Sequence, residues 1–198
     1  DSRARGHVTA SPRGGLCCDL DLAYYRGMRL RRKVCLLGAP GVGKSVLVRR
    51  FVEDRFEDEH EPSIAMSIFS GTVEVDDVSL EMMLWDPDTS EASGQYNRSF
   101  ISGASGLVFV ADATRPRTLD LLLEAQTKER GFIGLRPAIL VLNKTDLTEQ
   151  FALSDAQIAA ASRPNWYVVR ASAKTGYNVR EAFTKLAWMM LEARKATG

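Results

Sequence analysis

The sequence predicts a three-layer α/β fold, in which a six-stranded, mostly parallel sheet with one antiparallel edge strand carries helices on both faces. From residue 33 onward, short apolar, β-rich runs alternate with segments of helical periodicity, which is the pattern of βαβ units. A glycine-rich turn separates the first of these runs from the first helical segment. The 198 residues, of which 45% are hydrophobic, suffice for one such domain and an extension, because a domain has typically about 150 residues.

The individual elements follow from this alternation. The strands expected at 67–75 and 78–85 are joined by Asp76-Asp77, a turn pair that predicts a hairpin and hence the antiparallel pair. In the last helix, apolar side chains recur every three or four residues, which predicts one buried face. The expected strands are 33–37, 67–75, 78–85, 106–112, 138–142 and 166–170, and the expected helices are 44–53, about 92–103, about 118–130, about 154–162 and 179–195.

Residues 1–29 differ from the rest of the chain, because their arginines and aspartates follow neither a helical nor a strand period. We expect a disordered extension at 1–29 and a single domain at 30–198. The formal net charge of +1 excludes a strongly basic protein that coats nucleic acid. Apolar runs such as 107–111 and 138–142 fall far short of the roughly 20 residues that cross a bilayer.

The cysteines give a further expectation about location. Cys17, Cys18 and Cys35 cannot all pair within the chain, and their spacing does not match a zinc site. This usage favours a reducing, cytoplasmic compartment. The last five residues, Arg-Lys-Ala-Thr-Gly, contain no cysteine, so we expect no prenylation at the C-terminus.

The glycine-rich turn is the strongest functional signal. Residues 38–45 read Gly-Ala-Pro-Gly-Val-Gly-Lys-Ser and match the phosphate-loop pattern GxxxxGK[ST] between a predicted strand and a predicted helix. In such a loop, backbone N–H groups surround phosphate oxygens, the lysine reaches the β and γ oxygens, and the serine hydroxyl ligates Mg²⁺. The predicted phosphate-binding residues are Gly41, Val42, Gly43, Lys44, Ser45 and Val46, with Lys44 also acting in catalysis.

Two later segments identify the base. Asn143-Lys144-Thr145-Asp146 follows a predicted buried strand, so its carboxylate lies at the edge of the sheet where ligands bind in open α/β folds. The carboxylate of Asp146 accepts hydrogen bonds from N1–H and the 2-amino group of guanine, a pair of donors that adenine lacks. Ser172-Ala173-Lys174 follows the next predicted strand, where the Ala173 N–H donates to guanine O6. This pair of motifs disfavours an ATP-dependent enzyme.

Taken together, these segments resemble the motifs of the Ras-like small GTPases of the P-loop NTPase superfamily, particularly Rab-like and bacterial Ras-like members, over about residues 33–195. The resemblance implies the P-loop fold, binding of GTP and GDP, and Mg²⁺. Phe56 resembles the aromatic residue that packs against the base. Pro62-Ser63-Ile64 resembles switch I, with Ser63 as a metal ligand where threonine is usual. Trp85-Asp86 resembles the start of switch II, with Asp86 holding the metal through water.

The second switch departs from the family pattern Asp-x-x-Gly-Gln, because this chain reads Asp-Pro-Asp-Thr-Ser at 86–90. Thr89 replaces a glycine that contacts the γ-phosphate, and a β-branched residue resists positive φ. Ser90 replaces the glutamine that orients the attacking water, and its side chain is too short for that task. We therefore expect slow hydrolysis unless Gln95 or a partner's residue substitutes, and a supplied arginine alone is worth about 10³–10⁵ in rate. Pro40, where glycine is usual, is a second departure.

The predicted function is a GTP/GDP switch with Mg²⁺-dependent hydrolysis that is slow or depends on a partner. Effector, exchange or activating proteins would bind through switch I, from Glu57 to Ile64, and switch II, from Asp86 to Arg98. The alternative is a scaffold that binds GTP or GDP without hydrolysing it. The altered switch II favours the scaffold, whereas the intact phosphate loop and metal-binding aspartate favour the enzyme.

Overall fold

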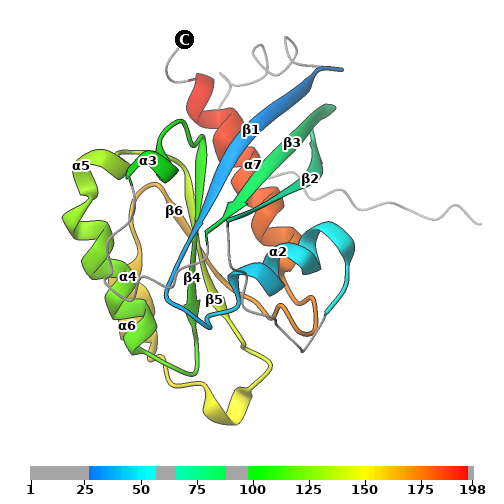
Figure 1. Ribbon diagram of the computed structural model, residues 1–198. Helices are drawn as coiled ribbons and strands as arrows, with labels where there is room; N and C mark the ends of the chain where they lie inside the picture. The colour runs from blue at the N-terminus through cyan, green and yellow to red at the C-terminus, as the bar shows by residue number, and fades with distance from the viewer. Residues whose placement is uncertain (1–26, 57–65, 88–97, 196–198) are drawn as a thin grey trace, which may run out of the picture.

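The computed structural model describes residues 27–56, 66–87 and 98–195, which form a six-stranded sheet flanked by helices (Figure 1). The strand order is β2-β3-β1-β4-β5-β6. This confirms the three-layer α/β fold that the sequence predicted. The strands are β1 (Arg29–Leu37), β2 (Ser67–Val75), β3 (Val78–Asp86), β4 (Gly106–Asp112), β5 (Ala138–Asn143) and β6 (Trp166–Arg170), and the helices are α2 (Lys44–Glu53), α3 (Arg98–Ile101), α4 (Arg117–Lys128), α5 (Arg130–Ile133), the 3₁₀ helix η1 (Thr148–Gln150), α6 (Asp155–Ala161) and α7 (Val179–Lys195).

Every strand pair is parallel except β2–β3, which is antiparallel along its whole length. Asp76 and Asp77 connect the two strands, and both have positive φ, 47° and 64°. Two consecutive residues in the left-handed region are typical of the hairpin turn whose twist matches that of the strands, and Asp tolerates this region better than most residues. The predicted hairpin at Asp76-Asp77 is confirmed.

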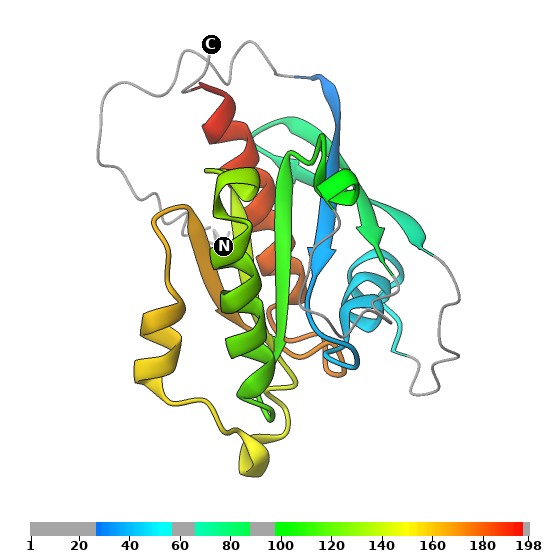
Figure 2. The ribbon, with the colours of Figure 1, turned by 60° about the vertical axis from the view of Figure 1, so that its left-hand side comes forward.

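Helices cover both faces of the sheet, as two views of the ribbon show (Figures 1 and 2). On one face, α2 and α7 pack against side chains such as Val34 and Leu36. On the opposite face, α3 to α6 pack against side chains such as Cys35 and Leu37. The alternation along β1 is therefore that of a central strand with a core on each side. Burial of the Cys35 thiol raises its pKa to about 12, which makes it an inert core residue.

The structure differs most from the sequence prediction at three elements. Strand β1 begins at Arg29, four residues earlier than expected and within the range assigned to the extension, because backbone pairing with β3 continues past the apolar residues. The helix expected at 118–130 is divided, since α4 ends at Lys128 and α5 begins at Arg130. Of the helix expected at about 92–103, residues 92–97 lie outside the described residues, and the described part is helical only in α3, which ends before Gly103, whose φ is 72°.

The strands also extend to polar residues that bear on function. Strands β3, β4 and β5 end at Asp86, Asp112 and Asn143, each of which is almost fully buried. The phosphate-loop sequence follows directly after β1. The carboxyl ends of the four central strands thus meet at one edge of the sheet, where ligands bind in this class of fold. Within the described ranges, the structure contains no helix long and apolar enough to span a membrane.

Candidate nucleotide-binding site

The predicted phosphate loop connects β1 to the N-terminus of α2. Lys44, Ser45 and Val46 are the first three residues of that helix, so its positive end faces the loop. Gly41 and Gly43 have φ of 71° and 93°, a region that side-chain-bearing residues rarely adopt. These torsions confirm that the glycine pattern marks a tight backbone turn in front of a helix.

Position 43 requires glycine for a second reason besides the torsion angle, which is the lack of space for a side chain. A Cβ atom on this residue would lie 2.5 Å from Nδ2 of Asn143, which is closer than such atoms approach in proteins. The loop therefore passes directly against the side chain that ends β5. Close approach of one backbone segment to another site residue explains why glycine occupies this position.

The ammonium group of Lys44 lies inside the curve of the loop. The residue is 7% exposed, and its Nζ donates to the carbonyl of Gly38 at 3.1 Å and to that of Ala39 at 3.4 Å. A buried lysine in a glycine-rich loop places a fixed positive charge where phosphate oxygens would bind. This position fits the phosphate contact that the sequence predicted for Lys44.

The two predicted metal-binding residues that the structure describes lie in contact. The hydroxyl of Ser45 donates to Oδ2 of Asp86 at 2.5 Å, and Asp86 is 3% exposed. Hydroxyl and carboxylate oxygens are the donors that Mg²⁺ prefers, and this ion usually takes one or two protein oxygens together with phosphates and water. Among the described residues, no cluster of three or more acidic, His or Cys side chains could hold a metal by itself. The pair therefore fits Mg²⁺ bound jointly with a phosphate ligand.

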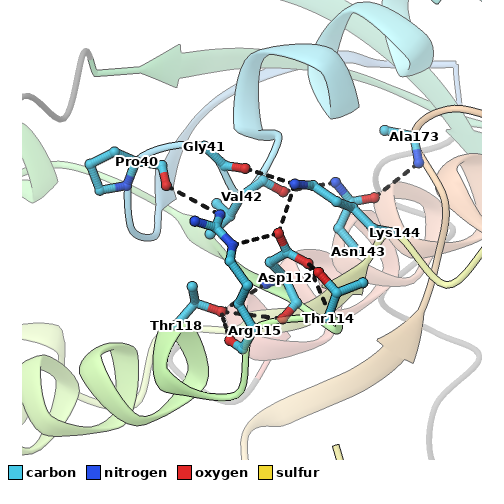
Figure 3. Close-up of polar contacts among 10 residues, drawn as sticks. All are labelled: Pro40, Gly41, Val42, Asp112, Thr114, Arg115, Thr118, Asn143, Lys144 and Ala173. Atoms are coloured by element: carbon cyan, nitrogen blue, oxygen red, sulfur yellow. Dashed lines mark hydrogen bonds and ion pairs between the residues drawn. The ribbon is translucent and has the colours of Figure 1, made fainter. Parts of the chain in front are cut away.

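Asn143 links the phosphate loop to the segment after β6 (Figure 3). Its Nδ2 donates to the carbonyl of Val42 at 2.9 Å, and its Oδ1 accepts from the backbone N–H of Ala173 at 3.0 Å. The residue is 2% exposed, so both hydrogen bonds are shielded from water. One side-chain amide thus fixes the relative position of the two loops predicted to bind the phosphates and the base.

Lys144, which follows β5, contacts the phosphate loop through its side chain. Its Nζ donates to the carbonyl of Gly41 at 3.0 Å and pairs with Oδ2 of Asp112 at 2.7 Å (Figure 3). The backbone of Lys144 has a φ of 67°, which turns the chain sharply at the end of β5. This turn directs the side chain to the loop rather than along the strand.

The carboxylate of Asp112 pairs with both Lys144 and Arg115. Burial opposes its ionisation, but hydrogen bonds from Lys144, Thr114 and Arg115 outweigh burial and lower the pKa of Asp112 from 3.8 to about 2. The Thr114 hydroxyl donates to Oδ1 at 2.7 Å, and Nε of Arg115 donates to Oδ2 at 2.8 Å. The carboxylate is therefore a stable anion that holds two cations beside the phosphate loop.

The predicted base-recognition residues lie together at the ends of β5 and β6. The hydroxyl of Ser172 donates to Oδ1 of Asp146 at 2.6 Å and orients the carboxylate. In turn, Ser172 Oγ accepts from the backbone N–H of Thr175 at 3.1 Å. The structure thus brings together the two motifs that the sequence separates by more than twenty residues.

A cavity of about 590 Å³ adjoins this carboxylate. Its volume lies in the range typical of small-molecule sites. None of its lining residues belongs to the phosphate loop. The lining residues are Thr145, Asp146, Thr148, Phe151, Arg170, Ser172, Thr175 and Tyr177.

Sequence reasoning missed Arg50, which supports the predicted base loop. From α2, its Nε donates to the carbonyl of Ala173 at 3.0 Å and its Nη2 to that of Lys174 at 2.6 Å. The side chain of this arginine is largely buried. It places the C-terminal half of α2 against the loop after β6. Phe56, which the sequence predicted to pack on the base, is half-buried three residues beyond the end of this helix.

Sequence reasoning also missed Asp112 and Arg115. The available signal was a carboxylate at the end of a strand of otherwise apolar residues, followed by a basic residue three positions later. Three predicted residues, Ser63, Ser90 and Gln95, lie outside the described residues, as does the whole segment expected to form switch I. Of the segment expected to form switch II, Asp86, Pro87 and Arg98 are described.

Comparison with known proteins agrees with this geometry. The model of the Ras family matches residues 33–192. The chain is 28% identical over 158 residues to the Ras-related protein Rab-1 of Theileria annulata and 29% identical over the same length to that of Theileria parva. Each alignment covers 78% of this chain and 72% of the relative. A sheet with one antiparallel pair, a phosphate loop and this family match lead to one conclusion: the chain belongs to the Ras family of P-loop small GTPases.

Proposed function

We propose that this protein is a guanine-nucleotide switch that binds GTP or GDP together with Mg²⁺ and hydrolyses GTP slowly or with the help of a partner. The observation that carries the proposal is the double hydrogen bond of Asn143, which joins the phosphate loop at Val42 to the base loop at Ala173. A nucleotide has both a phosphate end and a base end. A side chain that fixes the two loops relative to each other suits a ligand that spans both.

The choice of guanine rests on Asp146. Its carboxylate accepts hydrogen bonds but donates none, and Ser172 already occupies Oδ1 from within the protein. Guanine presents two donors, N1–H and the 2-amino group, to such an acceptor. The backbone N–H of Ala173, which we expected to donate to guanine O6, donates instead to Oδ1 of Asn143 at 3.0 Å, so the choice of guanine rests on the Asp146 carboxylate. Lys144 and Lys174 lie next to Asn143 and Ala173 in the sequence.

For the phosphates, the chain supplies positive charge and N–H donors. Lys44 provides a buried ammonium group, and the N-terminus of α2 adds its dipole. Bound Mg²⁺ would neutralise phosphate oxygens, with Ser45 and Asp86 as its protein partners. Ser63 is proposed as a further metal-binding residue from the sequence alone. Lys44 would also stabilise the charge that develops on the β–γ bridge during hydrolysis.

The proposed slow rate rests on the sequence of switch II. Glutamine reaches an attacking water, whereas the shorter Ser90 does not, and Gln95 is the nearest candidate in the chain to replace it. A partner that supplies a missing group would act on the same surface. We propose that effector, exchange or activating proteins bind at Glu57 to Ile64 and Asp86 to Arg98, and that the protein works in the cytoplasm, as its cysteine usage favours.

A second candidate function is a scaffold that binds GTP or GDP and does not hydrolyse it. Thr89 and Ser90, at positions where the family has glycine and glutamine, favour it. The two functions share every binding residue and differ only in turnover. A measurement of hydrolysis therefore separates them.

Single-turnover hydrolysis of bound GTP, on protein shown by chromatography to carry guanine nucleotide, tests the proposal. We expect a slow wild-type reaction that Ser90→Gln accelerates, while Ser70→Gln on the exposed side of β2 leaves the rate unchanged. Lys44→Ala should lose its bound nucleotide during purification. Wild-type protein that binds GTP but shows no turnover, alone or with lysate of its host, would establish the scaffold instead. Retention of GDP by Lys44→Ala at the wild-type level would contradict the assigned site.

A further inference from the structure

Every carbonyl group of the phosphate loop accepts a hydrogen bond from within the protein. In a phosphate loop the N–H groups turn inward toward the ligand, which leaves the carbonyls to find donors elsewhere in the protein. From Gly38 to Gly43 every carbonyl accepts a hydrogen bond, the donors in order being Lys44 for Gly38 and Ala39, Arg115 for Pro40, Lys144 for Gly41, Asn143 for Val42 and the N–H of Leu47 for Gly43.

Arg115 is the one side-chain donor in this set that lies outside the phosphate-loop and base motifs. Its Nη2 donates to the carbonyl of Pro40 at 3.4 Å, from a position directly after β4 (Figure 3). The guanidinium also covers Gly41, because a Cβ atom built on that glycine would lie 3.4 Å from the same Nη2. The group therefore lies against two consecutive residues of the loop.

The position of Arg115 is fixed from its other end. Nε of Arg115 donates to Oδ2 of Asp112 at 2.8 Å, and the hydroxyl of Thr118 donates to the Arg115 carbonyl at 2.7 Å. Asp112 is itself held by Thr114, and its side chain is only 1% exposed. A planar guanidinium anchored through Nε presents its two terminal nitrogens in a set direction. The arginine is thus oriented toward the loop before any ligand binds.

Arg115 and Lys144 share one carboxylate oxygen. Both cations contact Oδ2 of Asp112, Arg115 at 2.8 Å and Lys144 at 2.7 Å, and each also contacts a carbonyl of the phosphate loop. Removal of the arginine takes away one of the two cations that this oxygen holds beside the loop. The two loop contacts are therefore coupled through Asp112.

We propose that Arg115 is a positioning residue for the nucleotide diphosphate, which acts by holding the outer wall of the phosphate loop at Pro40 and Gly41. This inference rests on the proposed function. The loop N–H groups point correctly only while the peptide planes keep their orientation, and a donor on each outer carbonyl fixes those planes. A positive charge at the carbonyl end also polarises the peptide so that its N–H binds an anion more strongly.

A positioning role of Arg115 affects ligands with a β-phosphate more than ligands without one, whereas a general loss of stability affects both. The described contacts of Arg115 reach the phosphate loop, and none of them reaches the base-binding residues after β5 and β6. Its removal should weaken ligands that carry a β-phosphate and leave guanosine affected little. A destabilised fold would weaken all ligands alike.

The test compares Arg115→Ala with Arg117→Ala in the full chain. Arg117 lies two residues away and pairs with Glu124 on the surface of α4, so its removal is the matched control. We expect Arg115→Ala to release GDP about three- to tenfold faster than wild type, because the contact to Pro40 is long and the guanidinium is about half exposed. Affinity for GTP should fall in proportion, and affinity for guanosine should not change.

Arg115→Lys is the second variant and keeps the charge. An ammonium group has no planar fork, so it cannot reproduce the contacts to Asp112 and Pro40 together, and we expect intermediate GDP release. Release of GDP by Arg115→Ala at the rate of the Arg117→Ala control would overturn the inference, as would an equal loss of guanosine binding. Wild-type protein that binds no guanine nucleotide would instead refute the proposed function, so the two failures are distinguishable.

Discussion

Asn143 and Val42 are 101 residues apart in the sequence, yet Nδ2 of the first donates to the carbonyl of the second at 2.9 Å with almost no exposure to water. The same amide accepts from Ala173 through its oxygen. Because an amide has both a donor and an acceptor, it bridges two loops without carrying a charge into the core. The phosphate and base ends of the site are consequently one structural unit.

The first prediction concerns this bridge. Asn143→Ala removes both hydrogen bonds and leaves a buried carbonyl and a buried N–H without their partner, at a cost of about 1–3 kcal/mol for each group. We expect GDP release to accelerate at least tenfold. Asn165→Ala is the control, because Asn165 makes a comparable amide contact to the carbonyl of Arg136 away from the site. Equal GDP release from the two variants, measured by displacement of a fluorescent nucleotide, would contradict the bridging role.

Base specificity gives the second prediction. Asp146→Asn replaces one acceptor oxygen by an amide donor, so the side chain no longer matches the two donors of guanine. We expect weaker binding of GDP and a relative gain for xanthosine diphosphate, which presents an acceptor at position 2. Competition between the two nucleotides measures the ratio. Asp155→Asn, at a surface ion pair with Arg170, is the matched control. A ratio identical in both variants would show that Asp146 does not read the base.

The metal pair gives the third prediction. Ser45→Ala removes the hydroxyl that contacts Asp86 and that is proposed to bind Mg²⁺. GDP release from wild type should accelerate when Mg²⁺ is chelated, and release from the variant should be fast in both conditions, because the metal no longer adds to retention. Ser70→Ala, whose hydroxyl contacts Glu81 on the hairpin, serves as control and should keep the response to chelation. A Ser45→Ala protein with the wild-type response would refute the assignment.

The sequence predicted most of the fold and the motif residues because both follow local patterns. Apolar strands and amphipathic helices bury their residues wherever the chain pairs them. The pattern GxxxxGKS identifies a loop by itself, and NKxD does so in combination with the later Ser-Ala-Lys segment. Arg115 and Arg50 were missed because their roles depend on contacts 75 and 123 residues away along the chain. A lone arginine carries no periodic signal that distinguishes a loop support from a solvated side chain.

Boundaries were missed for a related reason. Strand β1 extends back to Arg29 through backbone pairing with β3, and all but one of its first five residues are basic, so hydropathy gave no indication of a strand there. On the exposed part of this strand, Arg31 pairs with Glu81 at 3.0 Å, a cross-strand contact. Pairing across a sheet depends on the neighbouring strand as much as on the strand itself.

The last prediction concerns acid stability. The pKa of Asp112 is lowered from 3.8 to about 2 in the folded protein, because hydrogen bonds from Lys144, Thr114 and Arg115 outweigh burial. The unfolded chain thus takes up this proton at a higher pH than the folded protein does. The stabilisation by Asp112 is complete above pH 3.8 and is lost as the pH falls through about 2. Its magnitude is about 2 kcal/mol.

Asp112→Asn should therefore lower the free energy of unfolding at neutral pH by about 2 kcal/mol, and the difference from wild type should shrink between pH 4 and pH 2. Denaturant unfolding followed by circular dichroism at a series of pH values measures this. Asp155→Asn controls for the loss of one carboxylate, because its side chain is exposed and its ion pair lies on the surface. A difference between Asp112→Asn and wild type that stays constant from pH 5 to pH 2 would show that the Asp112 carboxylate does not stabilise the fold through its charge.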